Sequence, residues 1–391
     1  MSIVTPKGFV ASGLAAGIKA SGALDLALLA TEDGSAVSTA ATFTTNRAAA
    51  APVQVSREHL RVAGGRAAAV LVSSGNANAA TGERGRADAE RMCELVSVGL
   101  GLGLRSEHVL VCSTGLIGIP LPMPVIESFL PELVSIRSTS EQAGRAAATG
   151  ILTTDAGPKE VLVEGAGFCV AGMAKGAGML APDMATMLAF LSTDARVEPS
   201  PLTDLLQSAV RDSFNAMTVD GCTSTNDTVV LMASGRAGPA DPKVVAQAVG
   251  EACSALVDRM LADAEGASRV MQVRVTGGES ESDAHRAARK VADSLLVKCS
   301  LNGADPYWGR VASELGSAGV AFELDRLAIS YGGVTVCRNG VASDHDTDAL
   351  ARHLSGRLVD IHCELGLGDA NAVVLGVDLG YGYIDENRTT S

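Results

Sequence analysis

The sequence predicts a mixed α and β fold in which strands and helices follow one another without regular alternation. Short apolar runs of strand length occur at Arg66–Ser74 and Glu107–Ser113, and the segment between them, Gly82–Gly99, places its apolar residues on one face of a helix. Later strand signals lack the regular helix spacing of a doubly wound sheet. Because 47% of the 391 residues are hydrophobic and only 3% are aromatic, we expect a core of Ala, Val, Leu and Ile.

The middle of the chain continues this mixture. Pro124–Ile136 is predicted to be a short helix. Glu160–Met173 is predicted to be two strands joined by a turn at Gly165–Gly167, where glycine favours a tight reversal. The apolar segment Met187–Leu191 is expected to be a core strand.

The second half begins with an amphipathic helix predicted over Pro201–Met217, with Ser200 as its cap and Pro201 in its first turn. Ser234–Asp241 is expected to be a surface loop. Further helices are predicted at Lys243–Leu261 and Ser282–Val297. The remaining strand signals are Asn226–Ala233, Val270–Val275, Leu327–Val336, Leu358–Cys363 and Ala372–Asp378. A compositional break near residues 277–281 predicts a C-terminal subdomain from about residue 278.

Bulk properties exclude several classes of function. The net charge of −13 argues against nucleic acid and anionic membranes as partners, because like charges repel. No run approaches the ~20 apolar residues of a membrane-spanning helix. The eight cysteines contain no Cys-x-x-Cys pair, and neither a metal site nor a disulfide framework is expected. These features are typical of a cytoplasmic protein with reduced thiols.

The most informative segment is Lys175–Met187, which places a hydroxyl residue, Thr186, after a glycine-rich approach. Threonine needs a neighbouring base to act as a nucleophile. Cleavage between Ala185 and Thr186 would create that base, since the freed α-amine lies within reach of its own hydroxyl and has an ordinary pKa near ~8. An isolated threonine in an apolar run is more typical of strand packing, so the surrounding motifs decide the interpretation.

These motifs resemble the ornithine acetyltransferase family, the glutamate N-acetyltransferases of arginine biosynthesis. The family signature is Lys-Gly-x-Gly-Met followed by Met-Ala-Thr, which matches Lys175–Met179 and Met184–Thr186. The resemblance extends over the whole chain in the family's order. The other matching blocks are Gly13–Lys19, Gly75–Gly82, Ser113–Gly118, Thr153–Asp155, Thr223–Thr228, Asp263–Gly266, Asp305–Arg310 and the Asn387 tail.

The resemblance implies layered sheets flanked by helices, with the strand that carries the nucleophile at the centre. It also implies self-cleavage into residues 1–185 and 186–391, two chains that stay together and associate into a heterotetramer. The implied reaction moves an acetyl group from N2-acetylornithine to glutamate by a ping-pong mechanism. No metal or organic cofactor is implied. Some members of the family also accept acetyl-CoA, and no motif in this sequence decides that point.

The resemblance assigns catalytic roles to three residues. Thr186 is the nucleophile of self-cleavage and the acceptor of the acetyl group. Thr114 and Gly115 match the oxyanion position, supplying a hydroxyl and a backbone N–H after a predicted strand. Lys175 has two open roles, since its charge could bind a substrate carboxylate or keep the Thr186 amine neutral.

The other assigned residues bind substrate. Glu265 carries the carboxylate that the positive side chain of ornithine would require, and Thr153 matches a threonine that contacts substrate, with Thr154 as the alternative. Asn387 and Ser391 match contacts of the family's C-terminal tail.

This chain departs from the family pattern at several positions. Its tail, Asn387–Ser391, is one residue shorter and lacks a tyrosine, Tyr307 replaces the usual asparagine, and Ser73 stands where asparagine is common. These changes leave the nucleophile and the oxyanion block intact but would suit a paralogue acting on a related amino acid. Two other classes stay open: an N-terminal-nucleophile amidohydrolase or aminopeptidase, and a non-catalytic ligand-binding relative.

Overall fold

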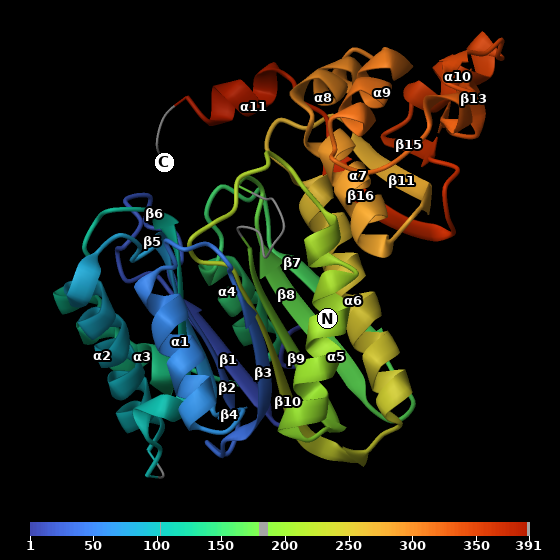
Figure 1. The fold of residues 1–391 in the computed structure, drawn as a ribbon. Helices are drawn as coiled ribbons and strands as arrows, with labels where there is room; N and C mark the ends of the chain where they lie inside the picture. Colours follow the sequence, from blue (N-terminus) through green and yellow to red (C-terminus); the bar gives the residue numbers. More distant parts are fainter. Residues whose placement is uncertain (102, 180–186, 389–391) are drawn as a thin grey trace. The chain divides into compact units, whose positions relative to one another are not determined.

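The computed structural model describes residues 1–101, 103–179 and 187–388 (Figure 1). These residues form two compact units. Unit 1 consists of Met1–Asn215 and Cys222–Met260, and unit 2 lies within Ala216–Gly221 and Leu261–Thr390. The mixed α and β class predicted from the sequence is confirmed, because both units contain sheets flanked by helices.

Unit 1 contains two sheets. The four-stranded sheet has the order β1 (Phe9–Leu14), β2 (Leu26–Thr31), β5 (Ala69–Asn76) and β6 (Val109–Leu116). The six-stranded sheet has the order β4 (Arg66–Ala67), β3 (Val37–Phe43), β10 (Thr228–Pro239), β9 (Leu188–Arg196), β8 (Cys169–Lys175) and β7 (Lys159–Glu164). Strands β9 and β10 are parallel and occupy the middle of this sheet, as predicted for the strand that follows residue 186.

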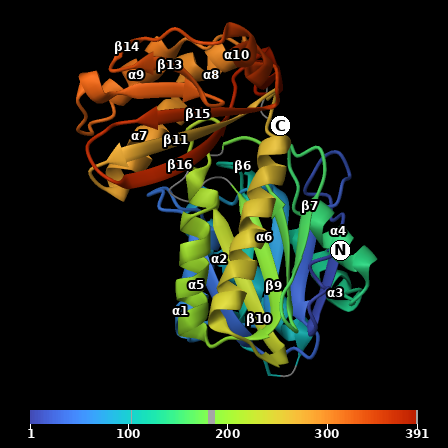
Figure 2. The ribbon, with the colours of Figure 1, turned by 90° about the vertical axis from the view of Figure 1, so that its right-hand side faces the viewer.

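Helices cover the outer faces of the two sheets, so unit 1 has four layers (Figure 1). The four-stranded sheet is covered by α1 (Ala51–Val62), α2 (Gly82–Leu100) and α3 (Met123–Ser135). The six-stranded sheet is covered by α5 (Pro199–Arg211) and α6 (Pro242–Ala262), which lie side by side in Figure 2. Helix α4 (Glu141–Gly150) packs against β1 and adds to the core between the sheets.

Packing on both faces of each sheet explains why the predicted strands appear in the sequence as continuous apolar runs. In β5, Ala69 and Leu71 contact the outer helices, while Val70 and Val72 join the core between the sheets. All four are at most 1% exposed. A strand that is buried on both faces gains from apolar residues at every position, so it loses the alternation of a half-exposed strand.

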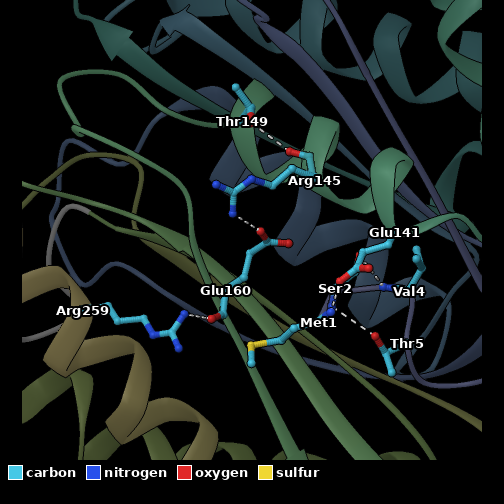
Figure 3. Close-up of polar contacts among 9 residues, drawn as sticks. All are labelled: Met1, Ser2, Val4, Thr5, Glu141, Arg145, Thr149, Glu160 and Arg259. Carbon is cyan, nitrogen blue, oxygen red and sulfur yellow. Dashed lines mark hydrogen bonds and ion pairs between the residues drawn. The ribbon is translucent and has the colours of Figure 1, made fainter.

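The edge strand β7 is anchored through Glu160 (Figure 3). Its carboxylate accepts a hydrogen bond from Arg145 of α4 at 2.6 Å, and its backbone carbonyl accepts one from Arg259 of α6. Both arginines act on one residue of the strand, so they hold β7 to helices that belong to different layers.

Unit 2 contains one six-stranded sheet with helices packed on it. The strand order is β14 (Val341–Ala342), β13 (Val334–Arg338), β12 (Ala328–Tyr331), β15 (Leu358–Glu364), β11 (Val270–Gly278) and β16 (Ala370–Val377). Its helices are α7 (Glu281–Asp293), α8 (Leu295–Asn302), α9 (Trp308–Gly316), α10 (Thr347–Leu354) and α11 (Tyr381–Glu386). Side chains of α7, α9 and α10 share one core with the sheet.

Several predicted boundaries are wrong. Helix α5 begins at Pro199, so Glu198 rather than Ser200 is its cap residue. The predicted loop Ser234–Asp241 is mostly strand, since β10 runs to Pro239 after a register shift. The signal at Leu327–Val336 is a hairpin, because Gly332 and Gly333 both have positive φ and separate β12 from β13.

The predicted helix Ser282–Val297 is also divided. Helix α7 ends at Asp293, and Ser294 caps the next helix by accepting a hydrogen bond from the backbone N–H of Val297. The sequence pattern continues across the break because both helices place apolar residues in the same core. Among the described helices, none is both long and apolar enough to cross a membrane.

Candidate active site

The candidate site in unit 1 lies where three strands of the six-stranded sheet meet. Lys175, the last residue of β8, is paired with Leu188, the first residue of β9. Leu188 is in turn paired with Thr228, the first residue of β10. Because β8 is antiparallel to β9, the end of β8 and the beginnings of β9 and β10 lie at one edge. The chain therefore enters β9 directly beside Lys175.

Asp227 holds the entry to β9. Its Oδ1 accepts a hydrogen bond from the backbone N–H of Met187 at 2.9 Å. The side chain is 1% exposed, and its Oδ2 has no hydrogen-bond partner among the described residues. Burial raises the pKa of Asp227 well above its usual range, although the Met187 N–H and the charge of Lys175 oppose the shift.

The predicted oxyanion residues lie at the end of β6 in the four-stranded sheet. Thr114 and Gly115 are paired with Ser74 and Gly75 of β5, and Thr114 is 4% exposed. Gly115 has a φ of +127°, and a Cβ atom there would lie 2.3 Å from the carbonyl carbon of Gly75. Only glycine fits this position, because another residue would be strained and would also collide with backbone.

Thr153 and Lys175 are brought together, and Asp155 connects them. The Nζ of Lys175 donates to the Thr153 hydroxyl at 3.3 Å. Asp155 accepts hydrogen bonds from the backbone N–H groups of Thr153, at 3.3 Å, and Gly176, at 2.7 Å. It also accepts one from the Nζ of Lys159, at 2.6 Å. One carboxylate thus fixes the loop that carries Thr153 to the end of β8.

Asp155 is ionised despite its burial. Burial alone would raise its pKa, but the charges of Lys175 and Lys159 and the hydrogen bond from Gly176 outweigh this effect and lower the pKa. A lowered carboxyl pKa stabilises the folded state above the ordinary value of 3.8, and this contribution is lost as the pH falls through the folded pKa.

We expect Asp155→Asn to lower the free energy of unfolding by about 3 kcal/mol at neutral pH, because it removes one partner of the buried Asp155–Lys159 ion pair. The difference from wild type should shrink as the pH falls below the ordinary value of 3.8, where Asp155 itself becomes protonated. Urea unfolding at neutral and acid pH measures both quantities.

Asp194→Asn is the matched control. Asp194 is also a buried carboxylate, but it accepts hydrogen bonds from the backbone N–H groups of Lys7 and Cys169, at the opposite end of β8. Asparagine keeps one acceptor for such bonds, so a loss of about 1 kcal/mol is expected. Equal losses for the two variants at neutral pH would contradict the role given to the Asp155–Lys159 ion pair.

Another buried carboxylate, that of Asp25, organises the segment Ala16–Lys19. Asp25 is 0% exposed and accepts hydrogen bonds from the four backbone N–H groups of this segment. Lys19 donates through its Nζ to the carbonyl of Leu24, at 2.6 Å. Burial lowers the pKa of Lys19, and the nearby charge of Lys175 adds to this effect. Lys19 is therefore a second cation near Lys175, and sequence reasoning did not assign it to the site.

In unit 2 the structure brings Glu265 and Asn387 together. The Nδ2 of Asn387 donates to a carboxylate oxygen of Glu265 at 2.8 Å and to the carbonyl of Tyr383 at 3.0 Å. Gly266 allows this approach, because a Cβ atom there would lie 2.0 Å from the backbone nitrogen of Tyr383. Glu265 is 8% exposed, so its carboxylate is fixed by neighbours rather than solvated.

The remaining predicted residues, Ala185, Thr186 and Ser391, lie outside the described residues. Sequence reasoning also missed Asp25, Asp155, Lys159, Asn226 and Asp227 as residues of this neighbourhood. Asp155, Asn226 and Asp227 do belong to the ordered sequence blocks, which is the signal that could have identified them. Among the described residues, no group of His, Cys, Asp and Glu is arranged to hold a metal ion.

Comparison with known proteins relates the whole chain to one family. A family model described as the ArgJ family matches residues 10–389. The arginine biosynthesis bifunctional protein ArgJ of Thermobifida fusca is 42% identical over 392 residues, which cover 100% of this chain and 100% of that protein. The protein of the same name from Mycobacterium leprae is 42% identical over 394 residues, which cover 100% of this chain and 95% of that protein.

Among solved structures, the ornithine acetyltransferase of Mycobacterium tuberculosis complexed with ornithine is 40% identical in sequence. The match covers 46% of this chain and 94% of that chain, with a TM-score of 0.42.

Proposed function

This chain belongs to the ArgJ family of arginine-biosynthesis acetyltransferases, and we propose that it transfers an acetyl group from N2-acetylornithine to glutamate through acetyl-Thr186. The observation that carries the proposal is the family match over residues 10–389, which includes Thr186 and the oxyanion block. The chain is accordingly an enzyme, and the proposal concerns its substrates, its nucleophile and its maturation.

Maturation begins with an attack within the chain. The hydroxyl oxygen of Thr186 attacks the carbonyl carbon of Ala185, the peptide C–N bond breaks, and an ester forms while the nitrogen becomes the free amine of Thr186. Water then hydrolyses the ester and releases a carboxyl group at Ala185. The products are residues 1–185 and 186–391, the second of which begins with the nucleophile.

Acetyl transfer uses the same hydroxyl twice. The α-amine of Thr186 takes the hydroxyl proton while the oxygen attacks the acetyl carbonyl of N2-acetylornithine. Thr114 and Gly115 donate to the oxyanion of the tetrahedral intermediate, and ornithine leaves with the proton. The amine of glutamate then attacks the acetyl ester and regenerates the free hydroxyl.

The described geometry supports this assignment at the entry to β9. Lys175 is paired with Leu188, two positions after Thr186 in the chain, so this residue lies beside the strand that continues from the nucleophile. A cation at this place disfavours protonation of the nearby amine and attracts a substrate carboxylate. Thr153, hydrogen-bonded to Lys175, is assigned to the same substrate. Glu265, Asn387 and Ser391 are assigned to substrate binding as well, with Glu265 pairing with the cationic side chain of ornithine.

The proposal extends to assembly. After cleavage the two chains remain hydrogen-bonded, because β8 precedes the cleavage site, β9 follows it, and six residue pairs join them from Val170–Thr193 to Lys175–Leu188. We infer that the paired chains associate further into a heterotetramer and act in the cytoplasm. Size-exclusion chromatography with light scattering tests the heterotetramer, and a mass equal to one copy of the chain would contradict it.

The first experiment is an intact mass of the purified protein under denaturing conditions. Two species, one ending at Ala185 and one beginning at Thr186, are expected. Incubation with N2-acetylornithine should then add an acetyl group to the species that begins at Thr186. A single full-length chain with no acetyl transfer would overturn the proposal.

Product analysis with and without glutamate separates transfer from hydrolysis. A transferase releases ornithine in proportion to the N-acetylglutamate formed, whereas an amidohydrolase releases acetate whether or not glutamate is present. Acetyl-CoA should be offered as a second donor, because the similar proteins are named bifunctional. The same assay with other acceptor amino acids tests whether the chain is a paralogue that acts on a related amino acid. This alternative is motivated by Tyr307, which replaces the usual asparagine and is 57% exposed.

A further inference from the structure

Two consecutive residues directly before β10, Asn226 and Asp227, contact different parts of unit 1. Asn226 contacts the end of the four-stranded sheet, and Asp227 contacts the beginning of β9. Both side chains are buried, with 5% and 1% exposed. They are therefore a direct polar connection between the two sheets near the candidate site.

The contacts of Asn226 use its whole side-chain amide. Its Nδ2 donates to the carbonyl of Ser113 at 2.8 Å and to that of Ala77 at 2.6 Å, and its Oδ1 accepts from the hydroxyl of Thr225 at 2.6 Å. Two carbonyl acceptors around one nitrogen fix the orientation of the amide. The side chain thus has one arrangement, and it holds the last part of β6 against the segment that leads into β10.

Asp227 likewise uses its side chain to hold a backbone group, in this case at the beginning of β9 in the six-stranded sheet. Its Oδ1 accepts the N–H of Met187, while the backbone N–H of Thr228 donates to the carbonyl of Met187 at 3.1 Å. The backbone bond belongs to the strand ladder, but the Asp227 bond engages the peptide unit that joins Met187 to the residue before it. The Asp227 bond thus fixes the N–H of the residue that follows Thr186 in the chain.

We propose that Asn226 and Asp227 form a clamp that sets the position of the nucleophile relative to the oxyanion donors. The proposal rests on the function proposed above. The carbonyl of Ser113 is bonded to the nitrogen of Thr114, and the nitrogen of Met187 is bonded to the carbonyl carbon of Thr186. Each contact of the clamp is therefore one covalent bond from a residue with an assigned catalytic role. Neither clamp residue touches substrate in this scheme, so both are positioning residues.

The chemistry explains why a rigid connection is required here. Attack on an acetyl carbonyl needs the nucleophile and the oxyanion donors on the same small group, at near-contact distances, and a misplacement of about 1 Å costs about 100-fold in rate. The donors belong to the four-stranded sheet and the nucleophile precedes a strand of the six-stranded sheet. A connection through two adjacent residues, placed directly before β10, fixes the ends of the two sheets relative to each other.

The test compares substitutions that break the clamp with one that preserves it. Asn226→Asp replaces two amide donors by an oxygen facing two carbonyls, and Asp227→Leu removes the acceptor for Met187. Both should lower the rate of self-cleavage and kcat by about 10- to 100-fold, with KM within about twofold of wild type, because the residues assigned to substrate binding are untouched. Asp227→Asn retains one acceptor and should remain within about threefold of wild type.

Asn46→Asp is the matched control. The Nδ2 of Asn46 donates to the carbonyl of Thr223 at 2.9 Å, so this change removes an amide donor from the same segment without touching β6 or Met187. It should leave both rates within about threefold of wild type. If Asn226→Asp does not fold, as judged by circular dichroism, Asn226→Ser applies the same test with a side chain too short to span both carbonyls.

The outcomes separate the clamp from the function. If the wild-type protein cleaves itself and transfers acetyl, but Asp227→Leu and Asn226→Asp match it in both rates, the clamp is wrong and the function holds. A rise in KM with unchanged kcat would also overturn the clamp, because it would indicate substrate binding. If Asp227→Asn lowers both rates as much as Asp227→Leu does, the hydrogen-bond acceptor for the Met187 N–H does not explain the effect, and the clamp is wrong. A wild-type protein that neither cleaves itself nor transfers acetyl overturns the proposed function first.

Discussion

Replacing Thr186 with valine is expected to leave one uncut chain of 391 residues and to lower acetyl transfer by about 10⁶-fold. Valine keeps the shape of threonine but has no hydroxyl, so neither the attack on Ala185 nor the acetyl ester can form. The nucleophile and its base act as a unit in a covalent mechanism, so removal of the nucleophile also removes the effect of the base, which explains the expected size of the loss. Intact mass and an assay of N-acetylglutamate formation measure the two consequences.

Thr186→Ser is the control, since serine retains a hydroxyl and, after cleavage, an α-amine. It should give two chains and a reduced but measurable rate of transfer. Cleavage of Thr186→Val at Ala185 would show that another group performs the cut. Full transfer activity in that variant would remove Thr186 from the mechanism altogether.

The second large effect is expected at the oxyanion position. Thr114→Val should lower kcat by about 100- to 1000-fold and leave KM nearly unchanged, because the hydroxyl is assigned to an oxyanion that exists only during the reaction. Thr114 lies at the end of β6, buried beside Gly115, so valine can occupy the site without reaching new space. Steady-state kinetics with N2-acetylornithine and glutamate measure both parameters.

Ser113→Ala is the matched control for Thr114→Val. Ser113 is the preceding residue of β6, and its hydroxyl is hydrogen-bonded to that of Ser73 at 2.8 Å. Its loss should cost about 1 kcal/mol of folding free energy without a large change in kcat. If Thr114→Val raises KM and leaves kcat unchanged, Thr114 binds substrate and does not stabilise the transition state.

The sequence predicted best those features that depend on local pattern or on ordered motifs. The family assignment is confirmed, and helices α2 and α3 and strands β7 and β8 appear close to their predicted bounds. Long apolar or amphipathic runs succeed because burial on a defined face is visible in the spacing of residues. The beginning of α5 was missed because Pro199 and Pro201 both fit a first turn, and the pattern could not choose between them.

The site was harder to predict because its support comes from pairs distant in the chain. Asp155 acts through Gly176, and Asn226 acts through Ser113. A buried aspartate and a solvated one look alike in sequence, since the difference lies in which N–H groups the fold brings to the carboxylate. The functional signal in the sequence was that Asp155 and Asn226 lie within the ordered motif blocks.

The strand order of the six-stranded sheet has a consequence for how long the protein would stay folded after the proposed cleavage. Strands β9 and β10 follow residue 186, yet they lie between β3 and β8, which precede it. An uncut chain makes this arrangement in a single-molecule search, whereas two separated chains would have to meet before the sheet could close. Under the proposed cleavage, unfolding would therefore be a dissociation, and recovery would become slower on dilution. Folding would have to be complete before the cut, and the cut molecule would be maintained by the slowness of its unfolding rather than by repeated refolding.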